Sequence, residues 1–461
     1  MRYSVVGLGK LGCSMAAAIA SRGHQVIGYD VDPKVVARLR AGAAPVEETG
    51  LAELITANRQ RLTATHSLEE AVEESDVTFV VVPTPSDERG AFLIDHARSA
   101  FSAVGRALQT KQGMHTVVLT STVLPGSTRY GLIPALELAS GRNAGEDVGV
   151  CYSPAFIALG SVVRDFLHPD LVLLGESDER AGSILLKAYE EILPDAPPIR
   201  RMTLENAELA KIAVNTFVTT KISFANMLAD LCERIPGGDV DVVTDALGLD
   251  RRIGRSYLTG ALGYGGPCFP RDNQALSFLA RALGSEAPIA DATDTINRAL
   301  PLRLVERLRG VADARGTVAV LGLAYKPATP VIDESQSLQI GLALAEAGAR
   351  VLGHDALAGN AVRSRHATAI EMVDDLQACI DRADVVLVTS PDAIYQSLRP
   401  EQFTRHGGRR IVMDFWRSLD PSFAATPGLE YHGIGLGLPV TNDGHALRAL
   451  WGMQADIIAT A

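Results

Sequence analysis

The sequence predicts an α/β protein in which two doubly wound domains are joined by a long central helix. Strand-length apolar segments alternate with helical patterns in the first and last thirds of the chain, which is typical of parallel sheets. One uninterrupted helical pattern separates these two regions. At 461 residues the chain is also too long for one ordinary hydrophobic core. We therefore expect three parts, at residues 1–198, 199–300 and 301–461.

Composition and charge exclude several classes of protein. Apolar residues make up 47% of the chain, but the longest apolar runs fall short of the roughly 20 residues that span a bilayer. Because the N-terminus leads directly into a strand without a signal peptide, we expect a cytoplasmic protein with no membrane partner. The net charge of -11 and the lack of a Lys/Arg run disfavour nucleic acid as a partner. The five scattered cysteines have no metal-ligand spacing and are expected to be reduced.

A glycine-rich turn follows the first predicted strand. The strand covers residues 3–6, the turn reads Gly7-Leu8-Gly9-Lys10-Leu11-Gly12, and after a helix to residue 22 a second strand over 25–29 ends at Asp30. In this context the pattern is typical of a Rossmann-like domain, whose glycines let a pyrophosphate approach the helix N-terminus. Asp30 is placed to bind a ribose, and an acid there favours NAD over NADP. The alternative, a purely structural glycine turn, gives Asp30 no role.

Two loops further along this domain are candidates for the cofactor cleft. Strands are predicted over 77–82, 116–119, 148–152 and 171–175, with helices over 97–108 and 178–193, and the sheet is expected to be parallel. Two of the strands end in hydroxyl and proline residues at their carboxyl ends, where doubly wound sheets bind ligands. Ordinary turn chemistry also explains each loop taken singly. The residues expected to line the cleft are Val82, Pro83, Thr84, Ser121 and Thr122.

The central helix is predicted over residues 204–235, between a proline-rich break at 194–198 and a Pro-Gly-Gly sequence. Lys211 and Asn215 lie four residues apart on it and therefore project from the same face. An amine beside an amide suits a polar site, although a solvated helix face is the other explanation. Residues 250–255 then bring three arginines, including Arg255, into one loop. They could bind a diphosphate or be solvated.

The stretch over residues 260–273 holds one thiol, Cys268, in a strongly constrained turn. Gly265 and Gly266 permit backbone angles and close contacts that other residues do not, while Pro267 and Pro270 restrict the flanking backbone. Pro270 suits the first turn of a helix, so Cys268 would lie just before a helix N-terminus, whose partial positive charge favours thiolate. Cys268 is therefore a candidate nucleophile. The alternative is a small apolar side chain buried in a turn.

A second alternating region begins at residue 317. Strands are predicted over 317–321, 350–354, 385–389 and 410–414, with a helix over 338–347. Its first turn, from Gly322 to Pro327, has a single glycine and so lacks the dinucleotide pattern. A sugar nucleotide is a better candidate ligand there than a second NAD. Lys326 is a candidate donor to that ligand, and a surface lysine is the alternative.

Taken in this order, the motifs resemble those of the nucleotide-sugar 6-dehydrogenase family over nearly the whole chain. The resemblance implies that the first domain binds NAD and that the last binds UDP. It also implies that the long helix joins the two and forms a homodimer interface, with the sugar at the junction of the domains. The motifs that carry it are Gly7-x-Gly9-x-x-Gly12, Val82 to Pro85, Ser121-Thr122-Val123, Lys211 to Asn215, Gly265 to Asp272 and Gly322 to Pro327.

The resemblance also implies a chemistry, the oxidation of a primary alcohol to a carboxylate in two hydride transfers. Cys268 would attack the intermediate aldehyde, and the resulting thiohemiacetal would be oxidised to a thioester that water cleaves. Lys211, Asn215 and Asp272 would hold charge and water around the first oxidation, and Thr122 would orient the water. The substrate-binding residues implied are Phe156, Ile157, Lys211, Asn215, Arg255, Tyr257, Leu258, Gly265, Cys268, Tyr325 and Lys326.

The chain departs from the family pattern at three positions. Ala155 and Leu159 stand where the family usually has glutamates, the first of which serves as a general base. General-base help is typically worth about 10²–10⁴-fold, so hydrolysis is expected to be slow or organised differently. Asp333 replaces an arginine of many members and affects the inter-subunit part of the sugar site.

The motifs around the cysteine bear on the substrate. Pro267 and Arg271 resemble the branch that acts on UDP-glucose more than the UDP-N-acetylhexosamine branch, and GDP-mannose stays open. One alternative is a variant enzyme that stops at an aldehyde or a stalled thioester, or that uses another UDP- or GDP-sugar. A second alternative, of a different class, is a sensor of NAD or nucleotide sugar without catalysis. The presence of Cys268, Lys211 and Asp272 argues against a sensor.

Overall fold

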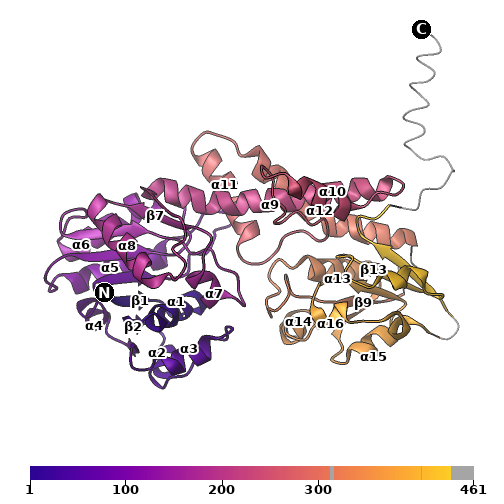
Figure 1. Cartoon of the computed structure of the whole chain (residues 1–461), viewed down its shortest axis with the longest axis horizontal. Coiled ribbons are helices and arrows are strands. Elements are labelled where there is room, and N and C mark those ends of the chain that lie inside the picture. Colours follow the sequence, from indigo (N-terminus) through magenta and orange to yellow (C-terminus); the bar gives the residue numbers. More distant parts are fainter. Residues whose placement is uncertain (312–315, 406–407, 438–461) are drawn as a thin grey trace, which may run out of the picture. The chain divides into compact units, whose positions relative to one another are not determined.

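The computed structural model describes residues 1–311, 316–405 and 408–437. The chain divides into two compact units, of which unit 1 comprises residues 1–214 and 278–285 and unit 2 comprises residues 215–277 and 286–461 (Figure 1). The long helix α9 (Leu204–Arg234) belongs to both, because the division falls within it. The predicted division into three domains stays a prediction.

Unit 1 is built on an eight-stranded sheet with the order β3-β2-β1-β4-β5-β6-β7-β8. Its strands are β1 (Arg2–Val6), β2 (Gln25–Tyr29), β3 (Leu62–Thr65), β4 (Val77–Val80), β5 (His115–Leu119), β6 (Val148–Tyr152), β7 (Val172–Glu176) and β8 (Ile199–Thr203). Its helices are α1 (Lys10–Ser21), α2 (Pro33–Arg40), α3 (Leu51–Ala57), α4 (Leu68–Glu73), α5 (Asp95–Leu108), the π-helix η1 (Ser127–Leu132), α6 (Ile133–Ser140), α7 (Val162–Leu167) and α8 (Glu179–Ile192).

The predicted parallel sheet is wrong at one pair of strands. Strands β6 and β7 pair antiparallel, whereas the other neighbours in this sheet pair parallel. The reason is that the connection through α7 returns the chain to the end of the sheet at which β6 finishes, without crossing its face. The alternating pattern of strands and helices does not distinguish such a connection from a crossover.

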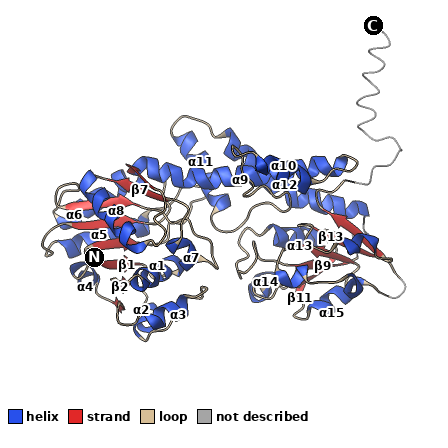
Figure 2. Ribbon diagram, in the orientation of Figure 1, coloured by secondary structure: helices blue, strands red, loops and turns tan. Residues whose placement is uncertain are grey.

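Helices cover both faces of this sheet because successive strand residues point into two different cores (Figure 2). On β1, Val5 packs in the core that α1 and α8 complete, and Val6 packs in the core that α5 and α6 complete. Strands β1, β4 and β5 end in register, with Val80 aligned with both Val6 and Leu119. The loops at residues 7–12, 82–85 and 121–126 therefore leave the same edge of the sheet.

Unit 2 contains a six-stranded parallel sheet with the order β11-β10-β9-β12-β13-β14, which repeats the order of the first six strands of unit 1. Its strands are β9 (Thr317–Leu321), β10 (Arg350–His354), β11 (Ile370–Met372), β12 (Val385–Val388), β13 (Arg410–Asp414) and β14 (Leu429–Gly433). Its helical elements are α10 (Val240–Leu249), α12 (Pro288–Val311), α13 (Gln336–Glu346), α14 (Gly359–His366), α15 (Leu376–Asp381), α16 (Ala393–Gln396), η2 (Pro400–Phe403) and η3 (Pro421–Ala425).

Helix α11 (Phe269–Ala282) begins in unit 2 and ends in unit 1. It starts one residue after Cys268, as predicted from Pro270. The predicted helices over 97–108, 178–193, 204–235 and 338–347 correspond to α5, α8, α9 and α13 with small shifts of their ends. Strands β3, β8, β11 and β14 were not predicted, and neither was helix α12. In the part of the chain that the structure describes, no helix has both the length and the apolar character that a membrane crossing requires.

Candidate active site

The glycine turn of unit 1 is shaped to accept a ligand at the start of α1. A Cβ atom at Gly7 would lie 2.2 Å from the Val81 carbonyl oxygen, and one at Gly12 would lie 1.9 Å from the carbonyl oxygen of Gly7. Gly7 also has a φ of +94°, which favours glycine. By contrast, a Cβ at Gly9 would meet nothing within 4 Å. No side chain caps the N-terminus of α1, so these residues fit the pyrophosphate of a dinucleotide.

Asp30 has a structural role that the sequence interpretation missed. Its Oδ2 accepts a hydrogen bond from the backbone N–H of Leu8 at 2.7 Å, and its Oδ1 accepts one from Asp32 at 2.8 Å. In unit 2, Asp355 likewise accepts from the backbone N–H of Leu323 at 2.8 Å in the corresponding turn. A structural glycine turn therefore does explain an acid at position 30, and its contact with a ribose stays a prediction.

The two predicted cleft loops of unit 1 are bonded to each other. The Ser121 hydroxyl donates to the Val82 carbonyl oxygen at 2.6 Å and accepts from the Val82 N–H at 3.0 Å. The Thr84 hydroxyl donates to the Thr122 carbonyl oxygen at 2.7 Å. Thr84 and Ser121 therefore fix the two loops against each other, while Pro83 is exposed and Thr122 is partly exposed. Lys10 and Leu11 form the first turn of α1.

Lys211 is buried on the first half of α9, with 7% of its surface exposed. Its ammonium nitrogen lies 4.8 Å from the centre of the Phe156 ring, in the range of a cation–π interaction. Phe156 and Ile157 follow strand β6 in a loop without regular secondary structure, next to Ala155. The structure thus brings two of the predicted substrate-binding residues, Phe156 and Lys211, into contact.

The loop that carries Ala155 and Leu159 is held by two carboxylates from other parts of unit 1. Glu48 accepts hydrogen bonds from the N–H groups of Gly160 at 3.1 Å and of residue 162 at 3.2 Å. Asp165 accepts from the N–H of residue 158 at 3.0 Å and from the Ser161 hydroxyl at 2.7 Å. The loop is therefore ordered by side chains other than the two that the family pattern leads one to expect.

In unit 2, Cys268 lies at the start of α11 beside a buried pair of polar side chains. The Cys268 carbonyl oxygen accepts the backbone N–H of Asp272 at 2.8 Å, in the first turn of the helix. The Asp272 carboxylate is 1% exposed, and its Oδ2 accepts from the Asn215 amide nitrogen at 2.6 Å. Nε of Arg271 lies 3.8 Å from the other carboxylate oxygen of Asp272. The predicted grouping of Asn215 with Asp272 is thus observed.

Exposure separates Cys268 from the other four cysteines, all of which lie within the described residues. Cys268 is exposed, whereas the others are buried. Burial raises the pKa of each of those four thiols, to about 12 for Cys13 and Cys379. Since the thiolate is the reactive form of cysteine, the buried thiols are poor nucleophiles.

The glycine turn before Cys268 packs against the loop over residues 325–334. A Cβ atom at Gly265 would lie 2.2 Å from the Glu334 carbonyl oxygen, and one at Gly266 would lie 2.5 Å from the Tyr325 ring. The Gly266 N–H also donates to the carbonyl oxygen of residue 333 at 3.0 Å. Burial, with a smaller contribution from the neighbouring Cys268, raises the pKa of Tyr325 to about 12. The predicted residues Gly265, Cys268 and Tyr325 are therefore neighbours.

Strained backbone accumulates around this turn. Tyr257, Ala328 and Glu334 have φ values of 63°, 57° and 52°, in the left-handed region that non-glycine residues rarely adopt. The Tyr257 ring packs edge to face against Phe269, with 6.4 Å between ring centres. Such strain persists only where surrounding structure imposes it, and it gathers at functional sites.

The remaining predicted substrate residues are less clearly arranged for a ligand. Arg255 pairs with Asp245 and donates to the carbonyl oxygen of Leu258, which is itself buried. The Lys326 ammonium nitrogen lies 5.9 Å from the centre of the Tyr325 ring. A diphosphate would have to compete with a carboxylate for Arg255, so its role in phosphate binding stays a prediction.

Sequence reasoning missed a polar cluster around Asn273, the residue that follows Asp272 on α11. The Tyr264 hydroxyl donates to Asp294 at 2.6 Å and accepts from the Asn273 amide at 2.9 Å. The Asn273 side-chain oxygen accepts from Thr219 at 3.1 Å. Consecutive residues of α11, Asp272 and Asn273, are thus bonded to residues one turn apart on α9. The spacing of Asn215 and Thr219 on α9 was a usable sign of the second pair.

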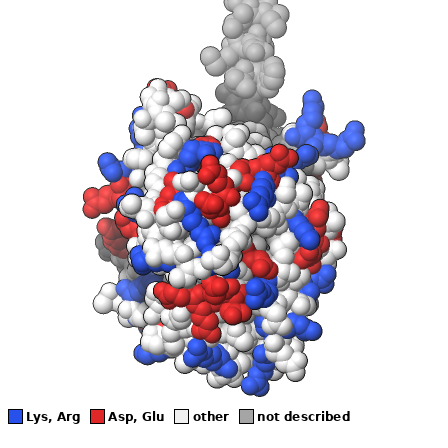
Figure 3. Space-filling view, turned by 90° about the vertical axis from the view of Figure 1, so that its left-hand side faces the viewer, with Lys and Arg blue, Asp and Glu red and all other residues white. Residues whose placement is uncertain are grey.

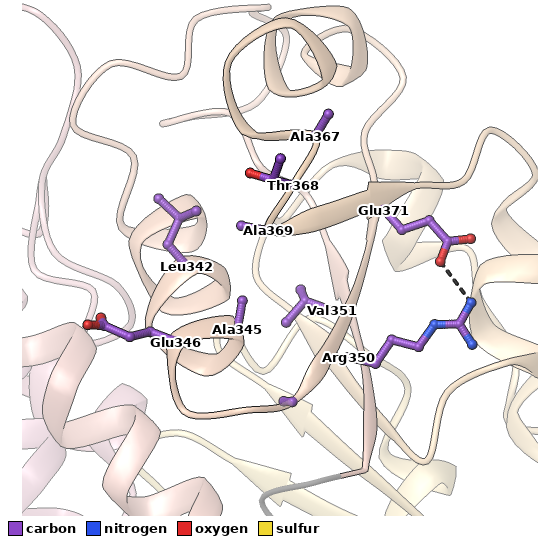
Figure 4. Close-up of a pocket in the computed structure, with 10 residues that line it drawn as sticks. Leu342, Ala345, Glu346, Arg350, Val351, Ala367, Thr368, Ala369 and Glu371 are labelled. Carbon is purple, nitrogen blue, oxygen red and sulfur yellow. Dashed lines mark hydrogen bonds and ion pairs between the residues drawn. The ribbon is translucent and has the colours of Figure 1, made fainter.

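A pocket of about 500 Å³ in unit 2 is distinct from these residues (Figure 4). It lies at the amino end of β10, where Arg350 pairs with Glu371, with 2.8 Å between them. The turn at Gly322 follows the carboxyl end of the parallel strand β9, at the opposite edge of the sheet. The pocket is lined by Leu342, Ala345, Glu346, Ala349, Arg350, Val351, Ala367, Thr368, Ala369 and Glu371.

Charge on the surface is mixed. On the face shown in Figure 3, acidic and basic side chains are interleaved and form no continuous basic area. With a net charge of -11, the protein has no general attraction for anions. An anionic ligand therefore has to be held by local donors such as the backbone N–H groups at the start of α1.

The fold and these residues define a dinucleotide-binding dehydrogenase with an exposed cysteine. Comparison with known proteins agrees with this class. Residues 1–193, 205–299 and 319–421 match the NAD binding, central and UDP binding domains of the UDP-glucose/GDP-mannose dehydrogenase family. The chain belongs to this family of nucleotide-sugar 6-dehydrogenases and is an NAD-dependent oxidoreductase.

Individual relatives match over most of their length. UDP-glucose 6-dehydrogenase AglM of Haloferax volcanii is 38% identical over 438 residues, which cover 94% of this chain and 100% of that protein. GDP-mannose 6-dehydrogenase of Pseudomonas putida is 32% identical over 86% of this chain and 93% of its own length. The structure of a UDP-glucose dehydrogenase from Pyrobaculum islandicum superposes with a TM-score of 0.84 at 36% identity, covering 94% of this chain and 98% of that one.

Proposed function

We propose that the protein oxidises the C6 alcohol of a nucleotide sugar to the uronate in two hydride transfers, with Cys268 as the covalent acceptor of the aldehyde. The observation that carries the proposal is the exposed thiol of Cys268 at the start of α11, with the bonded Asn215–Asp272 pair in the same helix turn. NAD would accept the hydride in both oxidations.

Each residue would have one task in this reaction. Lys211 would stabilise the negative charge that develops on the sugar oxygen as the alcohol loses its proton, before hydride transfer leaves the neutral aldehyde. The Cys268 sulfur would then add to the aldehyde carbon, and loss of a second hydride would leave a thioester. Water would cleave the C–S bond, which returns the thiol and releases the carboxylate. Asn215, Asp272 and Thr122 would hold the water and the protons in these steps.

UDP-glucose is the substrate that we favour. The relatives with 38% and 36% identity are named for UDP-glucose, and residues Pro267 and Arg271 flank the cysteine as in that branch of the family. GDP-mannose is the competing substrate, because GDP-mannose 6-dehydrogenases reach 32% identity. No single residue in the described part of the chain distinguishes a uracil from a guanine base.

The test is to incubate the purified protein with NAD and a panel of UDP- and GDP-sugars while counting NADH per sugar consumed. We expect two NADH and a uronate, with the highest kcat/KM for UDP-glucose. Cys268→Ser should yield at most one NADH per sugar, because the aldehyde then has no thiol to join. If no 6-hydroxy sugar nucleotide in the panel is turned over, the proposal is contradicted.

Ala155 favours one second candidate, an enzyme that stalls at the thioester. Without a carboxylate at positions 155 and 159, no side chain of the loop can remove a proton from water. In that case one turnover would form NADH rapidly, and mass spectrometry would find an acyl adduct on Cys268. A sustained rate at two NADH per sugar, with no adduct, would exclude the stalled enzyme.

The assembly that we propose is a homodimer through α9. In unit 2 this helix exposes Phe217, Phe224, Met227 and Leu231, whose exposed fractions are 67%, 44%, 41% and 48%. Their spacing of seven, three and four residues places them on one face of the helix. An apolar stripe of this kind on a surface helix marks an interaction site.

A further inference from the structure

Glu208 is a buried carboxylate of unit 1 that no step of the proposed reaction uses. It lies on the first half of α9 and is 0% exposed. Its Oε2 accepts the backbone N–H of Gly126 at 2.6 Å, and its Oε1 accepts the N–H of Thr128 at 2.9 Å. Burial of a carboxylate is costly unless its oxygens are bonded. The two backbone N–H groups meet this need, and they connect Glu208 to the segment that contains Gly126 and Thr128.

The two hydrogen bonds hold one end of the segment over residues 121–128, named here the Thr122 loop. The other end is held by the bond from Thr84 to the Thr122 carbonyl oxygen at 2.7 Å. At the end that Glu208 contacts, Gly126 has a φ of +89°, in the left-handed region that favours glycine. The two bonds to Glu208 therefore add a second polar anchor to a loop that also packs Val123 into a core of unit 1 and bonds to residues 82–84.

Glu208 also lies three residues before Lys211 on the same helix. Residues three apart in a helix are neighbours on one face. A single turn of α9 therefore carries both the ammonium group expected to stabilise the oxyanion and the carboxylate that anchors the loop of the water-orienting residue.

We propose that Glu208 is a positioning residue, whose carboxylate anchors the Thr122 loop to the turn of α9 that carries Lys211. The proposal rests on the proposed function for its effect on catalysis, because Thr122 and Lys211 have their roles there. The anchor itself is a property of unit 1 and can be tested without turnover.

The anchor depends on ionisation. Each carboxylate oxygen accepts a different N–H, which suits the ionised form, because a neutral carboxyl group would place its own O–H against one of these donors. Burial raises the pKa of Glu208 to about 7, although its hydrogen bonds oppose the rise. The nearby charged groups are Glu205 and Lys211 on α9 and Arg129 on η1, which pairs with Glu205. The anchor should therefore be about half formed near pH 7, strengthen above that pH and weaken below it.

The free energy of unfolding should also depend on the ionisation of Glu208, but it should fall as the pH rises, whereas activity should increase. The pKa of Glu208 is higher in the folded protein than the ordinary value of 4.5, so the folded state binds the proton more tightly. The contribution of Glu208 to stability is present at low pH and is lost as the pH rises toward about 7. A residue that only stabilised the fold would give this trend without a gain in activity at higher pH.

The test compares Glu208→Gln with the matched control Glu205→Gln. Glu205 lies one turn earlier on α9 and pairs with Arg129 of the same η1 helix, but it is 33% exposed, and Arg129 lowers its pKa. Glutamine at 208 keeps the shape and accepts only one N–H, so it mimics the protonated form. Two readouts are needed: the pH profile of kcat for NADH formation, and hydrogen exchange of residues 121–132 corrected for the intrinsic rate at each pH.

In the wild type, we expect kcat and amide protection to rise together with an inflection near pH 7. Glu208→Gln should lose the inflection, leave KM unchanged and lower kcat at high pH by roughly 10- to 100-fold, the size of effect that a small misplacement produces. Glu205→Gln should keep the inflection.

Protection of residues 121–132 that does not change with pH in the wild type would overturn the proposal. So would an inflection retained in Glu208→Gln. If the Gln variant fails to fold, the wild-type exchange profile alone decides. A wild type that forms no NADH with any nucleotide sugar would refute the proposed function, whereas the exchange measurement would still test the anchor.

Discussion

Among single residues, Ala155 bears most directly on the proposed release of the thioester, because the family pattern has a glutamate at this position. It follows strand β6 in a loop in which the N–H of residue 158 donates to Asp165 and the N–H of Gly160 donates to Glu48. The loop therefore keeps its shape without a glutamate at 155 or 159. Because those two carboxylates already accept hydrogen bonds, they do not replace a mobile general base in the same loop.

Restoring a carboxylate at this position should speed the release of the thioester. We expect Ala155→Glu to raise the steady-state rate of uronate formation by about 10²–10⁴-fold if hydrolysis limits the wild type. Ala155→Gln, which has a similar size and no basic group, should not. The measurement is steady-state NADH formation together with the burst of the first turnover. A fast steady state without a burst in the wild type would show that hydrolysis is not the slow step.

At the scale of elements, the contact between the cysteine turn and the 325–334 loop fixes the position of Cys268. Two glycines in succession make this contact possible, since Gly265 leaves room for the Glu334 carbonyl and Gly266 for the Tyr325 ring. Pattern reasoning explained these glycines by turn geometry and by close approach to a ligand. The close packing of a distant loop is the further reason for them.

A methyl group at Gly265 should separate the two loops. We expect Gly265→Ala to lower the free energy of unfolding by about 1–3 kcal/mol, as overpacking does, because its Cβ would lie 2.2 Å from a carbonyl oxygen. Gly359→Ala is the matched control, since its Cβ would meet no atom closer than 3.6 Å. Denaturant unfolding of both variants measures the difference. Equal stability of the two would contradict the packing argument.

The exposed stripe on α9 should be required for assembly. Phe224→Arg places a charge in the middle of this stripe, and a buried charge without a partner is strongly unfavourable. We expect this variant to be monomeric at concentrations at which the wild type forms the proposed dimer. Leu138→Arg is the control, because Leu138 is 90% exposed on α6. Light scattering after gel filtration gives the masses, and a Phe224→Arg dimer would argue against this interface.

At the scale of the whole molecule, Arg417 joins segments of unit 2 that are far apart in the sequence. Its Nε and Nη2 atoms donate to the two carboxylate oxygens of Asp241 at 2.7 and 2.8 Å. Its Nη1 donates to the carbonyl oxygens of Gly260 at 2.7 Å and Ile434 at 2.6 Å. The guanidinium therefore ties α10, the approach to the cysteine turn and the end of β14 together.

Removing this group should weaken the fold. We expect Arg417→Met to lower the free energy of unfolding by about 1.5–3 kcal/mol, the range for hydrogen bonds to charged groups. Arg399→Met is the control, because Arg399 is 67% exposed and 4.0 Å from Asp420, and exposed pairs contribute only about 0–1 kcal/mol. Chemical denaturation checks both. A decrease in the free energy of unfolding for Arg417→Met no larger than that for Arg399→Met would show that the hydrogen bonds of Arg417 contribute little to stability.

Much of the architecture was predictable because local patterns carry it. Strands β6, β9, β10 and β13 have the predicted bounds, since strong apolar segments end at glycine, proline or acidic residues. The short strands β3, β8 and β11 were missed, because none of them contains a continuous apolar run. The antiparallel turn between β6 and β7 was missed as well, because its direction depends on where the connection packs.

Sequence motifs were enough to establish the fold class, the dinucleotide turn and the family, because each motif is a run of residues close together in the chain. The role of Cys268 as the nucleophile stays a prediction. Which distant groups meet became visible in the folded structure alone. It showed that Asp30 supports the glycine turn, that Phe156 covers Lys211 and that Gly265 admits the Glu334 carbonyl. It also buried Glu208 against the Thr122 loop. These contacts bridge many residues of chain, and their energies depend on burial and close packing, which periodicity and motif spacing do not encode.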